Sequence, residues 1–362
     1  MTGLHVLVVD DSALMRRQIA AILEDAGHRV SLARDGRDAL EKAVQLDPDV
    51  VTLDIHMPEM DGLTCLSHLM IETPRPVVMV SSLTEKGALA TLEALALGAI
   101  DYVAKPGGTI SVDMASLAED LIRKVEVAAG ARRPGPAATT ESKSVPARPA
   151  ARTSPAPEPA DARSHGPGLI VIGVSTGGPR TLESILPLLP DTLPWPVVVV
   201  QHMPGSFTSA FARRMDGLCA LQVREVTGPV LVEPGVIHIA RGDSDLSLSR
   251  RARGLTLMPM PEDPKHTWHP SVSRLLAAVA EHVPAKSFVG VLLTGMGDDG
   301  AAEMACMHES GGFVIAESEQ TAVVYGMPKA LMDLDGADEQ LPMQAIAGRL
   351  CDWFGVEPRH VS

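Results

Sequence analysis

A long stretch rich in proline and alanine divides this chain of 362 residues into two parts. Between Ala131 and Gly168 the apolar periodicity is lost, and alanine, serine, threonine, arginine and eight prolines take its place. Such a composition buries too little apolar surface to offset the entropy that ordering would cost. We therefore predict a flexible linker at 129–167, with one domain at 1–128 and a second at 168–362.

Both parts alternate short apolar runs with segments that carry apolar residues at helical spacing. This alternation is typical of a doubly wound parallel sheet with helices on both faces. The sequence therefore predicts an α/β fold for each domain, with a more irregular region of short strands and turns near 220–265. The predicted strands are His5–Val9, Val50–Ile55, Val77–Val80 and Tyr102–Ala104 in the first part, and Leu169–Val174, Val197–Val200, Val289–Leu293 and Phe313–Ile315 in the second.

The charge balance argues against a nucleic-acid partner. Asp and Glu total 45 against 31 Lys and Arg, which gives a net charge of −14, and aromatic residues make up only 3% of the chain. A phosphate backbone would meet mainly repulsion, and few rings are available to stack on bases. The last 190 or so residues also lack a compact basic helical domain, so a transcription factor is disfavoured.

The N-terminus and the cysteines predict a cytoplasmic protein. The N-terminus reaches Asp10 before a signal-peptide core could form, and no stretch approaches 18 uninterrupted apolar residues. The cysteines show no metal-binding or disulfide spacing, so we expect buried thiols in a reducing compartment. They are Cys65, Cys219, Cys306 and Cys351. We expect no membrane insertion and a monomer.

Polar side chains follow the predicted strands of the first part. They are Asp10 and Asp11, then Asp54, then Ser81 and Ser82, and finally Lys105 and Pro106. Because the carboxyl ends of parallel strands meet at one edge of a sheet, these groups are expected to converge. Three carboxylates repel one another unless a hard cation such as Mg²⁺ joins them, and the lysine would balance an incoming phosphoryl group.

Each of these residues has an ordinary explanation when taken alone. Asp10 and Asp11 could cap the helix that starts near Ser12, and the segment after Asp54 could be a simple turn. Their combination, in this order and at these strand ends, favours a site. The set resembles the receiver domain of two-component response regulators, which has a flavodoxin-like sheet.

The receiver resemblance implies a role for each residue of the set. Asp54 would be the phosphoacceptor, and Asp10, Asp11, Asp54 and the His56 carbonyl would bind Mg²⁺. Ser81, Tyr102 and Lys105 would form the switch that responds to the phosphoryl group. A histidine kinase would be the phosphodonor.

Three strand ends of the second part carry the groups of a nucleophile, a base and an orienting carboxylate. Ser175 lies in the glycine-flanked turn 173–178, His202 follows the next predicted strand, and Asp298 or Asp299 lies in the loop after Val289–Leu293. A glycine turn alone could equally bind phosphate, and a lone histidine is commonly a surface residue. The order Ser, His, Asp also differs from that of the α/β-hydrolases. His266 and His269 lack a visible third ligand, so they do not predict a metal site.

The motifs of the second part resemble the chemotaxis protein-glutamate methylesterase (CheB) family. They are the turn 173–178, Gln201-His202-Met203-Pro204, the helix from Phe207 to Arg214, and 294–302. The resemblance implies hydrolysis of glutamate γ-methyl esters on chemoreceptors, with deamidation of receptor glutamines as a related activity. It implies Ser175, His202 and Asp299 as the triad, with amides near Thr176 and Met296 as candidates for the oxyanion site and no cofactor in this domain.

Two positions depart from the family pattern, and one rival function stays open. His238 stands where a tyrosine is expected, and Asp245 stands where a histidine is expected. The rival is a response regulator whose second domain binds receptors or the kinase without catalysis. A triad geometry inferred from sequence does not exclude that rival.

Overall fold

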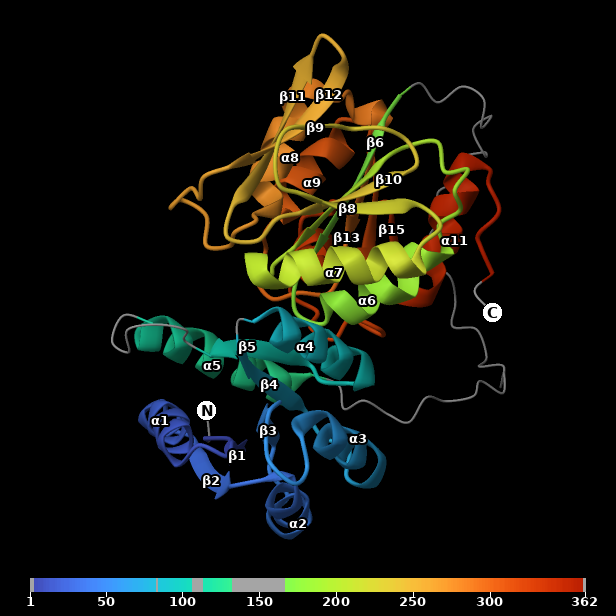
Figure 1. Ribbon diagram of the computed structural model, residues 1–362. Coiled ribbons are helices and arrows are strands. Elements are labelled where there is room, and N and C mark those ends of the chain that lie inside the picture. Colours follow the sequence, from blue (N-terminus) through green and yellow to red (C-terminus); the bar gives the residue numbers. More distant parts are fainter. Residues whose placement is uncertain (1–2, 83, 106–112, 132–166, 361–362) are drawn as a thin grey trace.

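The computed structural model describes residues 3–82, 84–105, 113–131 and 167–360 (Figure 1). Most of the predicted linker at 129–167, together with Pro106, lies outside these described residues. Figure 1 shows two domains, with the N-terminal domain below the C-terminal one. The last described helix of the N-terminal domain, α5 (Asp113–Gly130), extends two residues beyond the predicted boundary at 128.

The N-terminal domain is a parallel five-stranded sheet in the order β2-β1-β3-β4-β5 with helices on both faces. The central strands are continuous apolar runs and are buried, as expected for a sheet covered on both faces. Its elements besides α5 are β1 (His5–Val9), α1 (Ala13–Asp25), β2 (Arg29–Ala33), α2 (Gly36–Leu46), β3 (Val50–Asp54), α3 (Gly62–Glu72), β4 (Val77–Ser82), α4 (Glu85–Leu97) and β5 (Asp101–Lys105).

Short polar side chains and one glycine define how the helices of this domain begin. Ser12, Asp35, Asp61 and Thr84 cap α1, α2, α3 and α4, each accepting a hydrogen bond from a first-turn amide. Gly62 lies so close to β3 that a Cβ there would stand 2.1 Å from the Asp54 carbonyl oxygen. The glycine therefore lets α3 start directly beside the end of β3.

The C-terminal domain is built on a parallel seven-stranded sheet in the order β15-β14-β13-β6-β7-β10-β8, with an antiparallel sheet β11-β12-β9 beside it. The strands are β6 (Leu169–Val174), β7 (Val197–Gln201), β8 (Gln222–Val226), β9 (Val230–Leu231), β10 (Val236–Ala240), β11 (Asp245–Arg251), β12 (Gly254–Met260), β13 (Phe288–Leu292), β14 (Phe313–Glu317) and β15 (Glu339–Leu341). The helices are α6 (Gly178–Ile185), α7 (Gly205–Leu218), α8 (Val272–His282), α9 (Ala301–Glu309), α10 (Met327–Asp333) and α11 (Met343–Phe354), with short 3-10 turns at Leu186–Leu188 and Ala285–Ser287.

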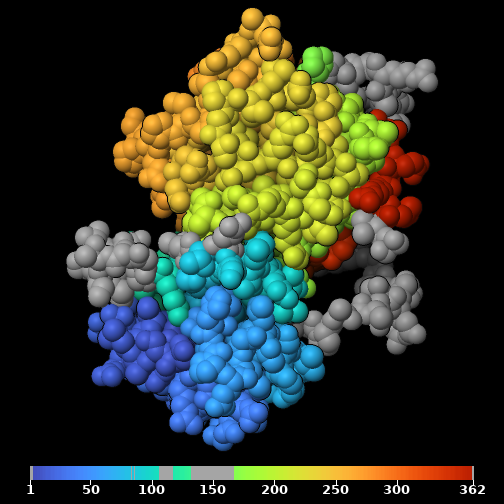
Figure 2. All heavy atoms as spheres, in the orientation of Figure 1, coloured from blue at the N-terminus to red at the C-terminus, as the bar shows by residue number. Residues whose placement is uncertain are grey.

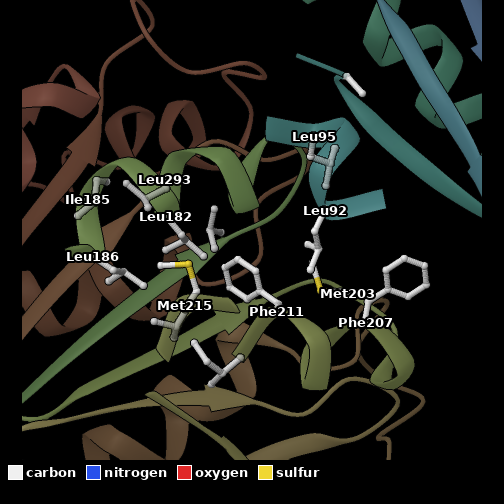
Figure 3. Packing of buried hydrophobic residues seen from close by; sticks show 14 of the residues in the cluster. Leu92, Leu95, Leu182, Ile185, Leu186, Met203, Phe207, Phe211, Met215 and Leu293 are labelled. Atoms are coloured by element: carbon white, nitrogen blue, oxygen red, sulfur yellow. The ribbon is translucent and has the colours of Figure 1, made fainter. Parts of the chain in front are cut away.

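The two domains share a buried apolar interface. Helix α4 packs against α6 and α7, and one continuous cluster of buried side chains includes Leu92 and Leu95 of α4 together with Met203 and Phe207 of the C-terminal domain (Figure 3). The Tyr102 ring of β5 stacks on Phe207 with a centroid separation of 4.5 Å. In Figure 2 the cyan atoms of the N-terminal domain lie directly against yellow-green atoms of the C-terminal domain.

The structure confirms the predicted α/β class, and the differences from prediction lie at sheet edges and one helix surface. Strands β2 and β15 were not predicted, because as edge strands they mix polar and apolar residues. The expectation of buried cysteines is wrong for Cys306, which is exposed, and for Cys219, which is half-buried. Helix α9 turns Met304 and Met307 inward and therefore turns Cys306 outward.

Candidate active site

The three strand ends singled out in the second domain are neighbours in its sheet. Ser175 follows β6, His202 follows β7, and Asp299 lies in the loop that follows β13. Strand β6 lies between β7 and β13. The chain first adds β7 on one side of β6 and later returns to add β13 on the other side. This is a switch point of the kind at which open α/β sheets place their sites.

Ser175 lies in a tight turn whose backbone is held from both sides. Its amide donates to the Thr294 carbonyl at 2.9 Å, and its own carbonyl accepts from the Gln201 side chain at 3.0 Å. Gly177 has a φ of +79° and leaves no room for a Cβ, which would lie 2.7 Å from Val323. The serine is therefore set on a constrained strand-to-helix turn at the start of α6.

His202 is paired with Asp299. Its Nε2 lies 2.8 Å from the Asp299 carboxylate, and both side chains are buried. Asp298, by contrast, is exposed. The amides of Val272 and Ser273, in the first turn of α8, and the Ser271 hydroxyl also donate to Asp299.

The environment of Asp299 keeps it ionised. Burial by itself would raise the pKa of the Asp299 carboxyl, but the hydrogen bond and charge of His202 and the Ser273 and Val272 amides outweigh burial and lower the pKa to about 2. An ionised carboxylate can only accept, so the proton between the two residues belongs to Nε2 of His202. In a neutral imidazole Nδ1 is then the basic nitrogen.

The Ser175 and His202 side chains are not hydrogen-bonded to each other in this structure. Nδ1 of His202 is buried and has no hydrogen-bond partner among the described residues. Ser175 and His202 nonetheless line the same cavity of about 180 Å³. Nδ1 is therefore not engaged by another of the described residues and remains available as a base.

The two expected oxyanion positions lie in the turn of Ser175 and in the loop that follows β13. Thr176 follows Ser175 directly and is buried, whereas Met296 lies in the loop 294–300 and is half-buried. Neither backbone amide donates a hydrogen bond to another of the described residues. Both amides therefore remain available as donors.

Residues of the N-terminal domain line one side of the cavity. Asp101 accepts a hydrogen bond from the Thr176 hydroxyl at 2.7 Å, and the Arg123 guanidinium lies 4.1 Å from the centre of the Trp268 ring. The cavity is lined from this side by Leu95, Asp101, Tyr102, Asp120, Arg123 and Lys124. Sequence reasoning missed Asp101, Arg123 and Trp268, because none of them belongs to a motif and only the docked arrangement brings them to the site.

The acidic cluster of the N-terminal domain is assembled at the ends of β1 and β3. Carboxylate oxygens of Asp10, Asp11 and Asp54 lie within 4.8 Å of one another. Lys105 bridges two of them, with Nζ 2.9 Å from Asp10 and 2.8 Å from Asp54. Burial raises the pKa of the Asp54 carboxyl and the charge of Asp10 adds to this rise, whereas Lys105 opposes it.

This donor set fits Mg²⁺. Three carboxylates in such a small space supply the oxygen ligands that the ion prefers. His56 is exposed, and its amide approaches the Asp54 carboxylate at 3.4 Å. Asp10, Asp11 and Asp54 are thus the side chains that would hold the ion.

Two further switch candidates lie near the end of β4 and near the start of β5. Ser81 is fully buried and its hydroxyl donates to the Gly87 carbonyl at 3.3 Å. Tyr102 is buried at the domain interface, where its ring lies against Phe207 and beneath the Lys124 ammonium. Tyr102 therefore contacts the very helix, α7, that follows His202.

Comparison with known proteins decides the family. The CheB methylesterase family model matches residues 170–350, and the response regulator receiver domain model matches residues 6–113. The protein-glutamate methylesterase/protein-glutamine glutaminase 3 of Rhodospirillum rubrum is 51% identical over 355 residues, which cover 96% of both chains. The chain belongs to the CheB methylesterase family.

Other relatives match this CheB chain over nearly its whole length. The protein-glutamate methylesterase/protein-glutamine glutaminase 2 of Rhodopseudomonas palustris is 46% identical and covers 98% of this chain and 99% of its own. The corresponding protein 2 of Carboxydothermus hydrogenoformans is 43% identical, with coverage of 97% and 99%. Within the described residues, no helix combines the length and apolar character needed to cross a bilayer.

His238, which departs from the family pattern, is buried within the sheet. It lies in β10 opposite Arg224 of β8, is 1% exposed, and neither ring nitrogen has a hydrogen-bond partner among the described residues. Burial, and then the Arg224 charge, lower the pKa of His238 from 6.5 to about 4. The imidazole is therefore neutral in the folded protein at neutral pH.

We expect His238→Phe to make the free energy of unfolding less dependent on pH between about pH 6.5 and pH 4. The unfolded chain binds a proton at this position near pH 6.5, whereas the folded chain resists protonation until about pH 4. The free energy of unfolding of the wild type should therefore fall by about 3 kcal/mol more than that of the variant as the pH drops through this window. Urea unfolding of the C-terminal domain at several pH values measures the difference. His360→Phe, at an exposed position, is the control; equal slopes for all three proteins would contradict the prediction.

Proposed function

We propose that this protein is a protein-glutamate methylesterase with protein-glutamine glutaminase activity, acting on chemoreceptors through Ser175, His202 and Asp299. The observation that carries the proposal is that His202, which is paired with the buried Asp299, lines the same cavity as Ser175. Family membership supports the substrate class, since the relatives bear both activities in their names.

The first half of the reaction forms a glutamyl-enzyme. Nδ1 of His202 takes the proton of the Ser175 hydroxyl as Oγ attacks the ester carbonyl. Asp299 holds the opposite nitrogen and stabilises the imidazolium that forms, and the Thr176 and Met296 amides are the candidates to bind the oxyanion. His202 then protonates the departing methoxide, so that methanol leaves.

The second half restores the serine. A water molecule, deprotonated by His202, attacks the glutamyl ester of Ser175, and collapse of the intermediate returns the proton to Oγ. The products are the free enzyme and a receptor glutamate carboxylate. With a glutamine substrate the same steps release ammonia in place of methanol.

Methanol release from methylated receptor membranes is the direct test of this function. The expected result is time-dependent methanol formation together with loss of methyl groups from the receptor. Binding to the membranes without methanol release, in the wild-type chain with a phosphodonor present, would instead support a non-catalytic output domain.

We further propose that phosphorylation of Asp54 regulates this activity, with a histidine kinase as the donor. Mg²⁺ held by Asp10, Asp11 and Asp54, with the His56 carbonyl as a further ligand, would neutralise carboxylate and phosphoryl oxygens. Lys105 would pair with the phosphoryl group, and Ser81 and Tyr102 would change position in response. We also propose that the protein is a cytoplasmic monomer.

The position of the receiver domain supports an inhibited resting state. Its residues form one wall of the cavity that contains Ser175, so a receptor segment approaching the serine from this side would meet the receiver domain. Phosphorylation would then act by weakening the contact of α4 and β5 with α7, because these elements adjoin the phosphoacceptor on one side and the active site on the other.

We expect Asp54→Asn to abolish Mg²⁺-dependent phosphorylation. The amide cannot form the acyl phosphate, whereas the isosteric side chain preserves the packing at the end of β3. The measurement is transfer of labelled phosphate from phosphorylated kinase to the variant, detected as acid-labile phosphate. Asp61→Asn, at the cap of α3, is the matched control and should be labelled normally. Undiminished labelling of Asp54→Asn would show that another residue accepts the phosphoryl group.

A further inference from the structure

The catalytic imidazole has an aromatic neighbour with no role so far. The Trp268 ring lies parallel to the His202 ring, with a centroid separation of 4.9 Å and an interplanar angle of 10°. Trp268 belongs to the segment between β12 and α8 and lines the cavity that contains Ser175. The indole thus covers one face of the imidazole.

The hydrogen bond to Asp299 does not by itself hold the imidazole in one orientation. His202 has a single side-chain hydrogen bond among the described residues, from Nε2, and the ring can still swing about the line of that bond. An indole packed on one face opposes this swing, because the tilted ring would enter the space that the indole fills. The position of Nδ1 is then constrained as well as that of Nε2.

We propose that Trp268 is a positioning residue that keeps Nδ1 of His202 directed to the serine. The inference rests on the proposed function, since it assigns Nδ1 as the base for Ser175. It separates two tasks: Asp299 selects which nitrogen carries the proton, and Trp268 sets the plane of the ring. A base misplaced by about 1 Å can cost about 10²-fold in rate.

A buried ionic cluster holds the segment that carries Trp268. The neighbouring His269 approaches the fully buried carboxylate of Asp245 with its Nδ1 at 3.1 Å, and the Ser271 amide donates to the same carboxylate at 3.0 Å. Arg274 pairs with Asp245 too. Because Ser271 also donates to Asp299, the cluster connects the support of Trp268 with that of the triad carboxylate.

Asp245 thereby has a structural reason to depart from the family pattern. A carboxylate at this position can accept from His269, Ser271 and Arg274 together, which a histidine could not do. Burial opposes ionisation of Asp245, but hydrogen bonds from Arg274 and His269 outweigh it and lower its pKa. The Asp245 carboxylate is therefore ionised at neutral pH and accepts from all three partners.

The outer side of Trp268 affects how the proposal must be tested. Arg123 of the receiver domain lies over this ring in the closed arrangement, so removal of the indole would also weaken domain docking and raise basal activity. The two effects oppose each other. Arg123→Ala removes the docking contact in advance, and Trp268 variants are therefore compared within the full-length Arg123→Ala protein.

The kinetic experiment measures methanol release from methylated receptor membranes over a range of receptor concentrations. Adding Trp268→Ala should lower kcat by about 10- to 100-fold with little change in KM. Trp268→Phe should stay within about threefold of the parent, because a flat ring remains, whereas Trp268→Leu should resemble alanine. Thr267→Ala, at the exposed neighbouring position, should have no effect. A higher KM with unchanged kcat would mean that Trp268 binds substrate, and the proposal would be wrong.

Nitrogen NMR of histidine-labelled full-length protein gives a second readout that needs no activity. In the Arg123→Ala parent, the His202 signals, identified by their loss in His202→Gln, should report one tautomer with the proton on Nε2. Because Asp299 still selects the tautomer, Trp268→Ala should leave the proton on Nε2 but broaden the His202 signals through exchange between ring orientations, and Trp268→Phe should restore sharp signals. Unchanged His202 signals in the alanine and leucine variants would overturn the proposal. A parent that shows the single tautomer yet releases no methanol would instead refute the proposed function alone.

Discussion

Replacement of Ser175 by alanine should remove nearly all methanol release while leaving the fold intact. The hydroxyl is the only group that forms the glutamyl-enzyme, so its loss leaves only the contribution of the oxyanion site and of substrate binding. We expect about 10³-fold residual catalysis over water. The measurement is methanol release from methylated receptor membranes, and Ser184→Ala, at an exposed position in α6, is the matched control.

Combined variants show whether Ser175, His202 and Asp299 act as one catalytic unit or contribute independently to the rate. His202→Ala should cost about as much as Ser175→Ala, and the double variant should be little worse than either, since triad members act as a unit. If the losses of activity in the two single variants multiply in the double variant, the residues do not act as a unit. Asp299→Asn should be far more damaging than Asp298→Asn, because only Asp299 is buried against His202. The reverse ranking would show that the wrong carboxylate has been assigned.

Opening the domain interface should raise the activity of the unphosphorylated chain by about tenfold or more. Leu95 of α4 is buried against the cavity that contains Ser175, and Leu95→Glu would place a charge in this apolar contact. A shift of only about 1.4 kcal/mol in docking changes the closed-to-open ratio tenfold. Methanol release without a phosphodonor measures the effect.

Two comparisons make the interface experiment decisive. Leu89→Glu, at an exposed leucine of the same helix, should leave basal activity unchanged, and both variants should still be phosphorylated at Asp54 if the receiver fold is intact. A fragment spanning about 165–362 should match or exceed Leu95→Glu. If neither the fragment nor Leu95→Glu is faster than the wild type, the receiver domain does not inhibit by occlusion.

Local patterns in the sequence were sufficient for the α/β class and for the central strands of the two parallel sheets. Continuous apolar runs such as Leu169–Val174 and His5–Val9 coincide with β6 and β1, because a strand buried on both faces must be apolar at every position. Strand β2 carries no such signature, since Arg29 and Ser31 alternate with apolar residues at an edge. Edge strands are recognised by their pairing, which is not a local property.

The sequence by itself indicated which residues are proposed to carry the chemistry, because Ser175, His202 and the pair Asp298 and Asp299 follow strands of one parallel sheet, and such strand ends converge. Only the tertiary structure decided that Asp299 rather than Asp298 turns inward, that Trp268 covers the imidazole, and that the receiver domain lines one side of the cavity. These features depend on contacts between residues far apart in the chain. Asp101 and Thr176, for example, are 75 positions apart and meet only because the two domains dock. No spacing or composition within either segment encodes that contact.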